Sequence, residues 1–397
     1  MFTLQKECTH SLEAYCREVF KEGVSIRKQS LDERFNKYAV EFMKSMVAYA
    51  LSIKLRVSEV RHDNRFRRII IGDSTIFQLP SNYAEKYKGS GGDASKAAIK
   101  VQYCYDLLGQ QIIDVCTQQG INQDHKYPLQ DIQKNDLRVE DLGYFKIQRL
   151  KNVHNAGAFF LSRLRFDINI YIIENGEYKC FDLLKEIKKI KNGLITSIGV
   201  YIGKIEKFPV RLVLEKIPED IANERRRKLK INAHNKCRAI TKERLIFCDV
   251  NAFITNCDEE QLPTDLIRQC YGLRWQIEII FKAWKSIFKI DKVKPIKLER
   301  FECLYYGCLM LIIASTQLLM FYKYRYIKKY KEEVSELKFF KLIVSLQEEL
   351  KNVLQKTKHK ISKLLEQIDY MIKQFCIKEQ KKDKIKPLTI LINLKLT

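Results

Sequence analysis

Hydrophobic residues recur at helical spacing near the start of the chain and again from about residue 263 onward, whereas short β-rich runs fill the part between. Apolar residues three or four positions apart place one face of a helix against a core. The sequence Ser30-Leu31-Asp32-Glu33 has the form of a capping box, so we predict that a helix begins there. A shorter helix before Gly23 would make this region a helix-turn-helix or a plain helical hairpin.

An aspartate lies in the middle of the first β-rich run. Residues 67–79 are mostly apolar or β-branched and carry Asp73 near their centre, which predicts a strand. The runs at 97–107 and 111–116 predict two more strands. A Gly-rich loop before them lacks the Lys-Ser/Thr of a phosphate-binding loop, so we expect it to be a connection. A further short strand is predicted to end at Asp141.

Short β-rich stretches dominate residues 150–256 and predict a mainly β insertion. The stretches are residues 158–164, 168–173, 178–181, 197–202, 210–214 and 244–248.

Further on, residues 303–322 carry no charge and have the length of a membrane span. They also contain Ser315, Thr316 and Gln317, so we expect a buried helix of a soluble domain, with a membrane protein as the alternative.

The net charge favours a polyanionic partner. Lysine and arginine outnumber aspartate and glutamate by 72 to 48, which gives a formal net charge of +24 and a pI near 9.4. This excess is spread along the chain and points most simply to nucleic acid. A generally basic cytosolic protein and a membrane-surface binder are the alternatives on charge alone.

The cysteines and the first residues indicate the compartment. The 12 cysteines form no C-x-x-C pair and no zinc spacing with histidine. Residues such as Cys104, Cys116, Cys180 and Cys248 are predicted to be small core residues in a reducing environment. The start of the chain lacks the charged-then-apolar pattern of a signal peptide, so we expect a cytoplasmic protein.

The segment from Tyr271 to Lys285 is predicted to be one amphipathic helix. Projected at about 100° per residue, Tyr271, Arg274, Glu278 and Lys285 share an arc of about 60° beside an apolar face. Such a face suits the phosphates of nucleic acid. Arg274 and Lys285 would neutralise backbone oxygens, Tyr271 would donate a hydrogen bond, and Glu278 would bind a metal ion. A solvated face with an ion pair between Glu278 and Lys282 is the alternative.

The spacing Tyr-x2-Arg-x3-Glu-x6-Lys resembles the signature of the DDE transposases encoded by bacterial insertion sequences. The resemblance extends over about residues 30–325 in several blocks. These blocks are Asp73-Ser74-Thr75, Asp141-Leu142-Gly143-Tyr144-Phe145 with Phe159-Phe160-Leu161-Ser162-Arg163, Glu224-Arg225-Arg226-Arg227 and Phe253-Ile254-Thr255-Asn256. The resemblance implies a catalytic triad of Asp73, Asp141 and Glu278, an inserted β domain, and a homodimer in the DNA complex.

The intervals between the three acids agree with a ribonuclease H-like core. From Asp73 to Asp141 is 68 residues, and from Asp141 to Glu278 is 137, which is too long for one connection within such a core. We therefore expect an α/β fold: a ribonuclease H-like catalytic core interrupted by a mainly β insertion, with helical N- and C-terminal regions. The predicted parts are residues 1–62 (helical, a candidate DNA-binding region), 63–150 (core, first part), 151–256 (β-rich insertion), 257–325 (core, second part, with the catalytic helix) and 326–397 (helical and basic).

The three carboxylates suit two Mg²⁺ ions, with Mn²⁺ as a substitute, because hard divalent cations prefer carboxylate oxygens. Water is expected to be the first nucleophile at the element's end, and the freed 3′-hydroxyl the second. Expected partners are double-stranded DNA of transposon ends and target, bound at the nucleoid, with no membrane.

Several alternatives remain open. Asp136 is the rival to Asp141 within the chain. For the whole protein the rivals are a decayed or repurposed transposase that binds DNA without strand transfer, a nuclease of the same fold that cuts but never joins, and a membrane protein.

Overall fold

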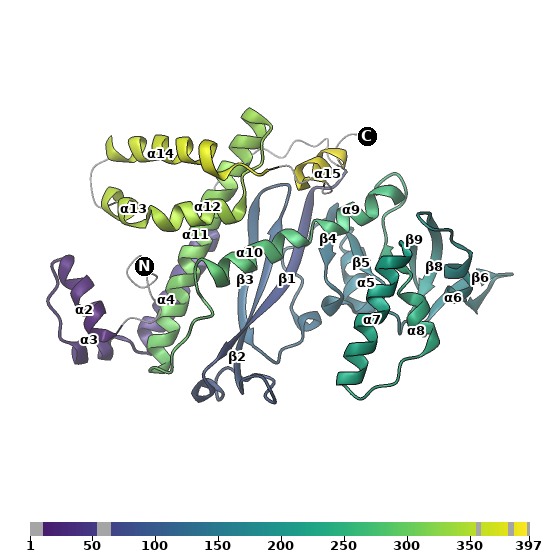
Figure 1. The fold of residues 1–397 in the computed structure, drawn as a ribbon, viewed down its shortest axis with the longest axis horizontal. Helices are drawn as coiled ribbons and strands as arrows, with labels where there is room; N and C mark the ends of the chain where they lie inside the picture. The colour runs from purple at the N-terminus through teal and green to yellow at the C-terminus, as the bar shows by residue number, and fades with distance from the viewer. Residues whose placement is uncertain (1–10, 54–64, 355–358, 380–384, 395–397) are drawn as a thin grey trace. The chain divides into compact units, whose positions relative to one another are not determined.

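The structure is a computed structural model that describes residues 11–53, 65–354, 359–379 and 385–394 (Figure 1). The chain divides into two compact units. Unit 1 comprises Met1–Glu59, Ser74–Asn122 and Trp275–Lys384. Unit 2 comprises Val60–Asp73, Gln123–Arg274 and Ile385–Thr397.

Strand β1 (Arg68–Leu79) belongs to both units, because the division falls between Asp73 and Ser74. In unit 1 the strand order is β3-β2-β1, and β2 (Ala97–Asp106) pairs antiparallel with β3 (Gln111–Gln119). In unit 2 the order is β1-β4-β5-β10-β9-β8-β6-β7. Mixed strands and helices in both units confirm the predicted α/β class.

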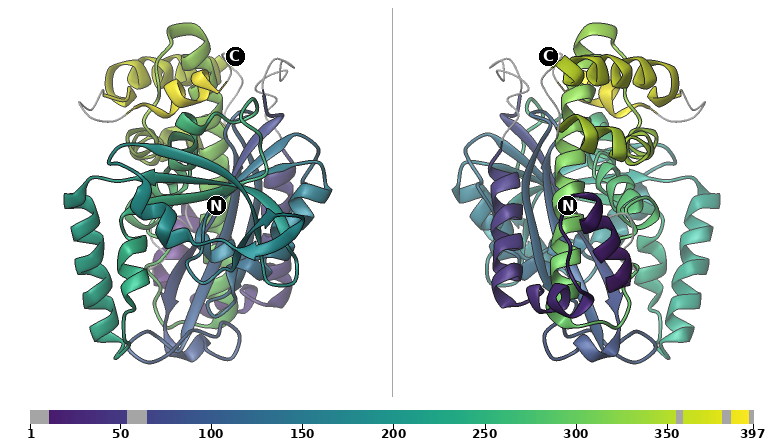
Figure 2. Two further views of the ribbon diagram at one scale, coloured as in Figure 1. Left: turned by 90° about the vertical axis from the view of Figure 1, so that its right-hand side faces the viewer. Right: turned by 90° about the vertical axis from the view of Figure 1, so that its left-hand side faces the viewer.

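The helices of unit 1 pack against its strands and each other. Helix α4 (Lys37–Ser52) lies along α11 (Leu298–Tyr330), where Gln317 Nε2 donates hydrogen bonds to the carbonyls of Ala50 and Ile53. The other helices described here are α2 (Leu12–Lys21), α3 (Lys28–Arg34), α10 (Trp275–Ser286), α12 (Glu336–Ser345), α13 (Gln347–Leu354) and α14 (His359–Met371), with a π-helical turn at Ile372–Cys376. Figures 1 and 2 show α12–α14 gathered at one end of α11.

Helix α11 contains the uncharged run at 303–322. Its length and apolar composition would suit a membrane span, but 72% of its most apolar 18-residue window is buried inside the protein. Tyr305 on this helix shares a hydrogen bond of 2.8 Å with Thr117 on β3, and buried Glu302 binds Lys86 Nζ at 2.7 Å. A core helix of a soluble protein explains both its composition and its polar contacts.

The central strands of unit 2 are buried, whereas β7 at the edge of the sheet is exposed. Strands β4 (Asp136–Glu140) and β5 (Phe159–Arg163) are parallel neighbours, and all five residues of β4 are buried. The remaining strands, β6 (Ile170–Glu174), β7 (Glu177–Cys180), β8 (Ile195–Ile202), β9 (Phe208–Lys216) and β10 (Val250–Thr255), pair antiparallel. Its helices are α5 (Ile147–Asn155), α6 (Leu183–Lys189), α7 (Glu219–Asn235), α8 (Lys242–Phe247), α9 (Ile267–Gly272) and α15 (Pro387–Asn393). The five-part domain division predicted from the sequence stays a prediction.

Three local predictions are wrong. The capping box at Ser30 lies inside α3, and the real cap is Asn36, whose Oδ1 accepts from the amides of Tyr38 and Ala39 at the start of α4. Residues 244–248 belong to α8 and the turn after it, not to a strand, because the Thr241 hydroxyl caps a helix there. Cys180 is exposed at the end of β7 rather than in the core.

Candidate active site

The parallel pairing of β1 with β4 places Asp73 and Asp141 at corresponding positions. Their register pairs Gly72 with Glu140, the residues that immediately precede the two aspartates. Asp73 continues β1, whereas Asp141 leaves β4 and precedes the 3-10 turn Leu142–Tyr144. Because the residues directly before them are paired in register, Asp73 and Asp141 occupy neighbouring positions, with Asp73 in the middle of β1 and Asp141 directly after the end of β4.

Arg274 lies between the two aspartates. Its Nη1 is 2.5 Å from Asp73 Oδ2, and its Nε is 3.8 Å from Asp141 Oδ1. The side chains of Arg274, Asp73 and Asp141 are 9%, 17% and 44% exposed, so Asp141 is the one most open to solvent. A guanidinium between two carboxylates reduces their mutual repulsion.

Tyr271 packs beside this ion pair. Its ring centroid is 6.0 Å from the guanidinium carbon of Arg274 and 5.3 Å from the ring centroid of Phe253. Burial raises the pKa of Tyr271 to about 12, and the charge of Asp141 acts in the same direction, while Arg274 opposes it. Tyr271 is therefore a neutral phenol at physiological pH.

The predicted single helix from Tyr271 to Lys285 is wrong. Helix α9 ends at Gly272 and α10 begins at Trp275, with Arg274 between them. The amides of Leu273 and Arg274 bond to carbonyls three residues back, at Cys270 and Tyr271, which tightens the turn and interrupts the α-helical repeat. The angular projection across this break does not hold.

Helix α10 carries Glu278 and Lys285 in unit 1. The helix is anchored by Trp284, which is fully buried and meets the Tyr103 ring edge-on at 5.5 Å. Lys285 Nζ lies 5.5 Å from the ring centroid of Phe77. A groove of about 680 Å³ along this helix is lined by Glu278, Phe281, Lys282, Lys285, Ser286, Lys289, Asp291 and Lys292. Four lysines against two acids make this groove suited to a polyanion.

Asp136, the rival second aspartate, has a structural role. It is fully buried at the start of β4 and accepts from Arg68 Nε at 3.1 Å, Arg68 Nη2 at 2.7 Å and Arg67 Nη2 at 2.9 Å. A further bond of 2.9 Å comes from the amide of Gln133. Because these donors occupy both oxygens, Asp136 is not placed to bind a metal ion.

Sequence reasoning missed a buried charge cluster beneath the site. Glu140 accepts from Arg138 Nε at 2.7 Å and from Arg149 Nε and Nη2 at 2.8 and 2.7 Å. Burial alone would raise the pKa of Glu140, but the two arginines outweigh it and lower the pKa to about 2. The signal was an alternation of arginine and glutamate in a strand whose neighbours are apolar.

The carboxylates of Asp73 and Asp141 are suitable ligands for a hard divalent cation, but the described residues place no third ligand beside them. Asp73 and Asp141 supply carboxylate oxygens, the ligand type such ions prefer. Across the part of the chain that the structure describes, no three His, Cys, Asp or Glu side chains form a ready-made metal cage. The roles of Glu278 and of the triad as a whole therefore stay a prediction.

Two neighbouring carboxylates are ligands of the kind that metal-dependent phosphoryl-transfer enzymes use, and comparison with known proteins identifies the family. A family model described as "Transposase DDE domain" matches residues 64–314, and the chain belongs to this family. It is 35% identical over 390 residues to the transposase of insertion sequence element IS1151 from Clostridium perfringens, covering 93% of this chain and 82% of that protein. It is 32% identical over 382 residues to the transposase of IS231B from Bacillus thuringiensis subsp. berliner, covering 91% and 80%.

A solved structure is also similar at a lower level. The piggyBac transposase synaptic complex with hairpin DNA matches with a TM-score of 0.47 and 12% identity, covering 98% of this chain and 76% of that chain. The family assignment rests instead on the sequence comparisons.

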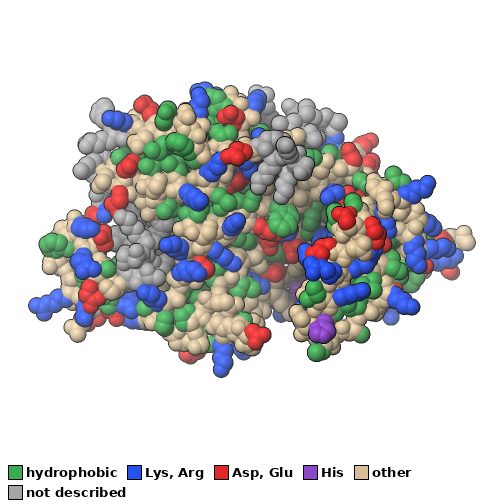
Figure 3. All heavy atoms as spheres, in the orientation of Figure 1, with side chains coloured by type: hydrophobic (Ala, Val, Ile, Leu, Met, Phe, Trp, Pro, Cys, Tyr) green, Lys and Arg blue, Asp and Glu red, His purple; other side chains and the backbone are tan. Residues whose placement is uncertain are grey.

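The recognised family confirms the prediction of an insertion-sequence DDE transposase, an enzyme that acts on DNA. The domain implies dependence on a divalent metal ion, DNA as partner, and a soluble, cytoplasmic protein. Lys and Arg side chains spread over much of the visible face, with acids among them, agree with a diffuse attraction to DNA (Figure 3).

Proposed function

We propose that the chain cuts DNA at the ends of its element and joins the freed 3′-hydroxyl to target DNA, with Asp73, Asp141 and Glu278 as ligands of two Mg²⁺ ions. The observation that carries the proposal is the pair of aspartates at corresponding register positions of β1 and β4, with Arg274 between them. Mn²⁺ is expected to substitute, because it accepts the same oxygen ligands.

The short separation along the chain between Glu278 and Arg274 supports Glu278 as the third metal ligand. Glu278 follows Arg274 by four residues, so the chain keeps their Cα atoms within about 14 Å in any arrangement. Arg274 itself contacts Asp73. When bound, two divalent ions would activate the attacking oxygen and stabilise the leaving one.

The chain's own residues have separate tasks. Arg274 reduces the repulsion between Asp73 and Asp141 and offers a guanidinium to a nearby phosphate. Tyr271 remains protonated and can donate a hydrogen bond to a phosphate oxygen. Lys285, in the groove along α10, neutralises backbone charge. Water is the first nucleophile and the new 3′-hydroxyl is the second.

The core is proposed to be ribonuclease H-like with a mainly β insertion. The order β3-β2-β1 in unit 1 and β1-β4-β5 in unit 2, with β1, β4 and β5 parallel, supports this assignment. A homodimer on DNA and association with the nucleoid follow from the family resemblance and are part of the same proposal.

The test uses DNA carrying the flanking ends of the element, incubated with and without Mg²⁺. Joined products support transposition, nicks alone indicate a nuclease, and a metal-independent complex without cleavage indicates a decayed, DNA-binding transposase. Asp73→Asn, Asp141→Asn and Glu278→Gln should each reduce cleavage by roughly a thousandfold, since each removes a metal ligand. Full activity of any one of them would exclude that residue from the triad.

A further inference from the structure

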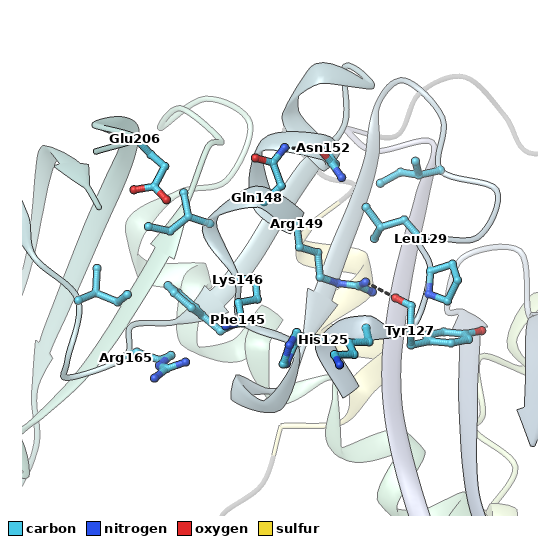
Figure 4. A pocket seen from close by; sticks show the side chains of 15 residues that line it. His125, Tyr127, Leu129, Phe145, Lys146, Gln148, Arg149, Asn152, Arg165 and Glu206 are labelled. Atoms are coloured by element: carbon cyan, nitrogen blue, oxygen red, sulfur yellow. Dashed lines mark hydrogen bonds between the residues drawn. The ribbon is translucent and has the colours of Figure 1, made fainter. Parts of the chain in front are cut away.

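A basic pocket lies within unit 2, apart from the predicted catalytic residues (Figure 4). Its volume is about 910 Å³, and it is formed by the loop at 125–132, the start of α5, and the turns that carry Arg165 and Glu206. Its lining contains a single acid, Glu206. The basic side chains in the lining are His125, Lys126, Lys146, Arg149 and Arg165.

Two of these cations are already compensated. Arg149 is buried and donates to both oxygens of Glu140 and, at 2.5 Å, to the carbonyl of Tyr127, a bond drawn in Figure 4. Arg165 forms a bidentate ion pair with Asp167, with Nε 2.9 Å from Oδ1 and Nη2 2.5 Å from Oδ2. These arginines shape the pocket rather than give it net charge.

Lys126 and Lys146 supply the uncompensated charge. Both are exposed, and neither forms an ion pair with an acid among the described residues. The pKa of His125 is lowered, first by burial and then by Lys146, Lys126 and Arg149, while Asp124 acts in the opposite direction. The cations around His125 thus outweigh the neighbouring acid.

Backbone donors add to this potential. Lys146 precedes α5 and its side chain makes no capping hydrogen bond. The next residues, Ile147, Gln148 and Arg149, line the pocket, and the amides of a first helical turn have no partner within the helix. The helix dipole favours an anion at this end.

We propose that this pocket binds backbone phosphates of a DNA strand that runs on from Asp73 and Asp141. The proposal rests on the proposed function and names a second contact for the same substrate. Lys146 follows Asp141 by five residues, so their Cα atoms are at most about 17 Å apart. At an axial rise of about 3.4 Å per phosphate of one duplex strand, this spans at most about five nucleotides.

The pocket suits phosphates better than stacked bases. The rings of Tyr127 and Phe145 are 2% and 3% exposed, so neither offers a free face to a base. The accessible groups are instead ammonium and amide donors, which match phosphate oxygens.

The test measures binding of duplex DNA from the element's end, by fluorescence anisotropy without divalent metal, across a range of salt concentrations. The variant combines Lys126→Ala with Lys146→Ala. Its matched control combines Lys185→Ala with Lys188→Ala, two exposed lysines of α6 that also lie in unit 2. In the test variant, the logarithm of the association constant should fall less steeply with the logarithm of salt concentration, the slope being smaller in magnitude by about two. Binding at roughly 0.1 M salt should be roughly 60-fold weaker, whereas the control should change little. Arginine at both test positions should restore the slope.

An equal loss in test and control variants, with unchanged urea midpoints, would overturn the proposal. So would tight saturation of the wild-type pocket by dATP that the test variant loses, because that result identifies a free-nucleotide site. Cleavage by the wild type is scored separately. A protein that binds with the expected slopes but never cuts would leave this site standing and reject the proposed catalysis.

Discussion

Arg274 Nη1 lies 2.5 Å from Asp73 Oδ2, so one arginine is the direct partner of the first predicted catalytic aspartate. The same side chain approaches Asp141 at 3.8 Å. The cation thus balances the charge of the two carboxylates. It also connects the residues directly after α9 to Asp73 within β1 and to Asp141 directly after β4.

Arg274→Gln should separate metal binding from DNA chemistry. Removing the guanidinium leaves both carboxylates available, so Mn²⁺ binding measured by calorimetry should be retained or tightened. Cleavage should fall by roughly a hundredfold, because a charge-assisted phosphate contact is lost. Arg268→Gln, at an exposed position of α9 that pairs with Glu215, is the control and should leave both metal binding and cleavage nearly unchanged. Loss of metal binding in Arg274→Gln would contradict this role.

The same substitution should lower stability at Asp136 and cleavage at Asp141. Asp136→Asn breaks a buried pair with Arg68 and should cost about 3–5 kcal/mol of unfolding free energy. Asp141→Asn, at a side chain that is 44% exposed, should leave stability within about 1 kcal/mol and abolish cleavage. Urea denaturation and a cleavage assay on both variants decide the matter. Metal-dependent cleavage that survives in Asp141→Asn would show that the assignment is wrong.

Stability should fall in acid because of buried Glu140. Its folded pKa of about 2 lies below its ordinary value of 4.5, so the unfolded chain binds a proton more readily. The stabilisation is therefore fully present above about pH 4.5 and is lost as pH falls toward 2. Urea midpoints measured between pH 6 and pH 2.5 should show this decline, and it should be smaller in Glu140→Gln than in the wild type. Equal slopes in the two proteins would refute the assignment.

The chain's two tryptophans make a matched pair on α10. Trp284 is fully buried against Tyr103, so Trp284→Ala should cost about 3–5 kcal/mol of unfolding free energy. Trp275 is 59% exposed, and Trp275→Ala should cost less than about 1 kcal/mol. Chemical denaturation measures both. Similar losses in the two variants would mean that α10 is not anchored through Trp284.

Local sequence patterns predicted the elements in which the polarity of consecutive residues reflects their burial. Asp73 was placed in a strand because apolar and β-branched residues flank it, and β1 covers it. The buried helix at 303–322 followed from an uncharged run that also holds polar groups, as α11 shows. The family was predicted from the order and spacing of several weak blocks, and the comparisons confirm it.

Other features depended on partners far along the chain. The break at Arg274 could not be predicted from helical periodicity, because that residue bonds to Asp73, some 200 positions earlier. Residues 244–248 look β-rich, yet a cap at Thr241 starts a helix there. The structural role of Asp136 likewise could not be predicted from the sequence, because its partners Arg67 and Arg68 lie almost 70 positions earlier in the chain.

The sequence by itself determined the α/β class, the family and the chemical types available: three acids, a phenol and cations in a fixed order. Only the tertiary structure decided that Asp73 and Asp141 follow paired residues of adjacent parallel strands, that Arg274 lies between them, and that Lys126 and Lys146 line one basic pocket. The physical reason is that periodicity records whether a residue faces a core or solvent. Strand register and charge pairing between distant segments are decided when those segments pack together.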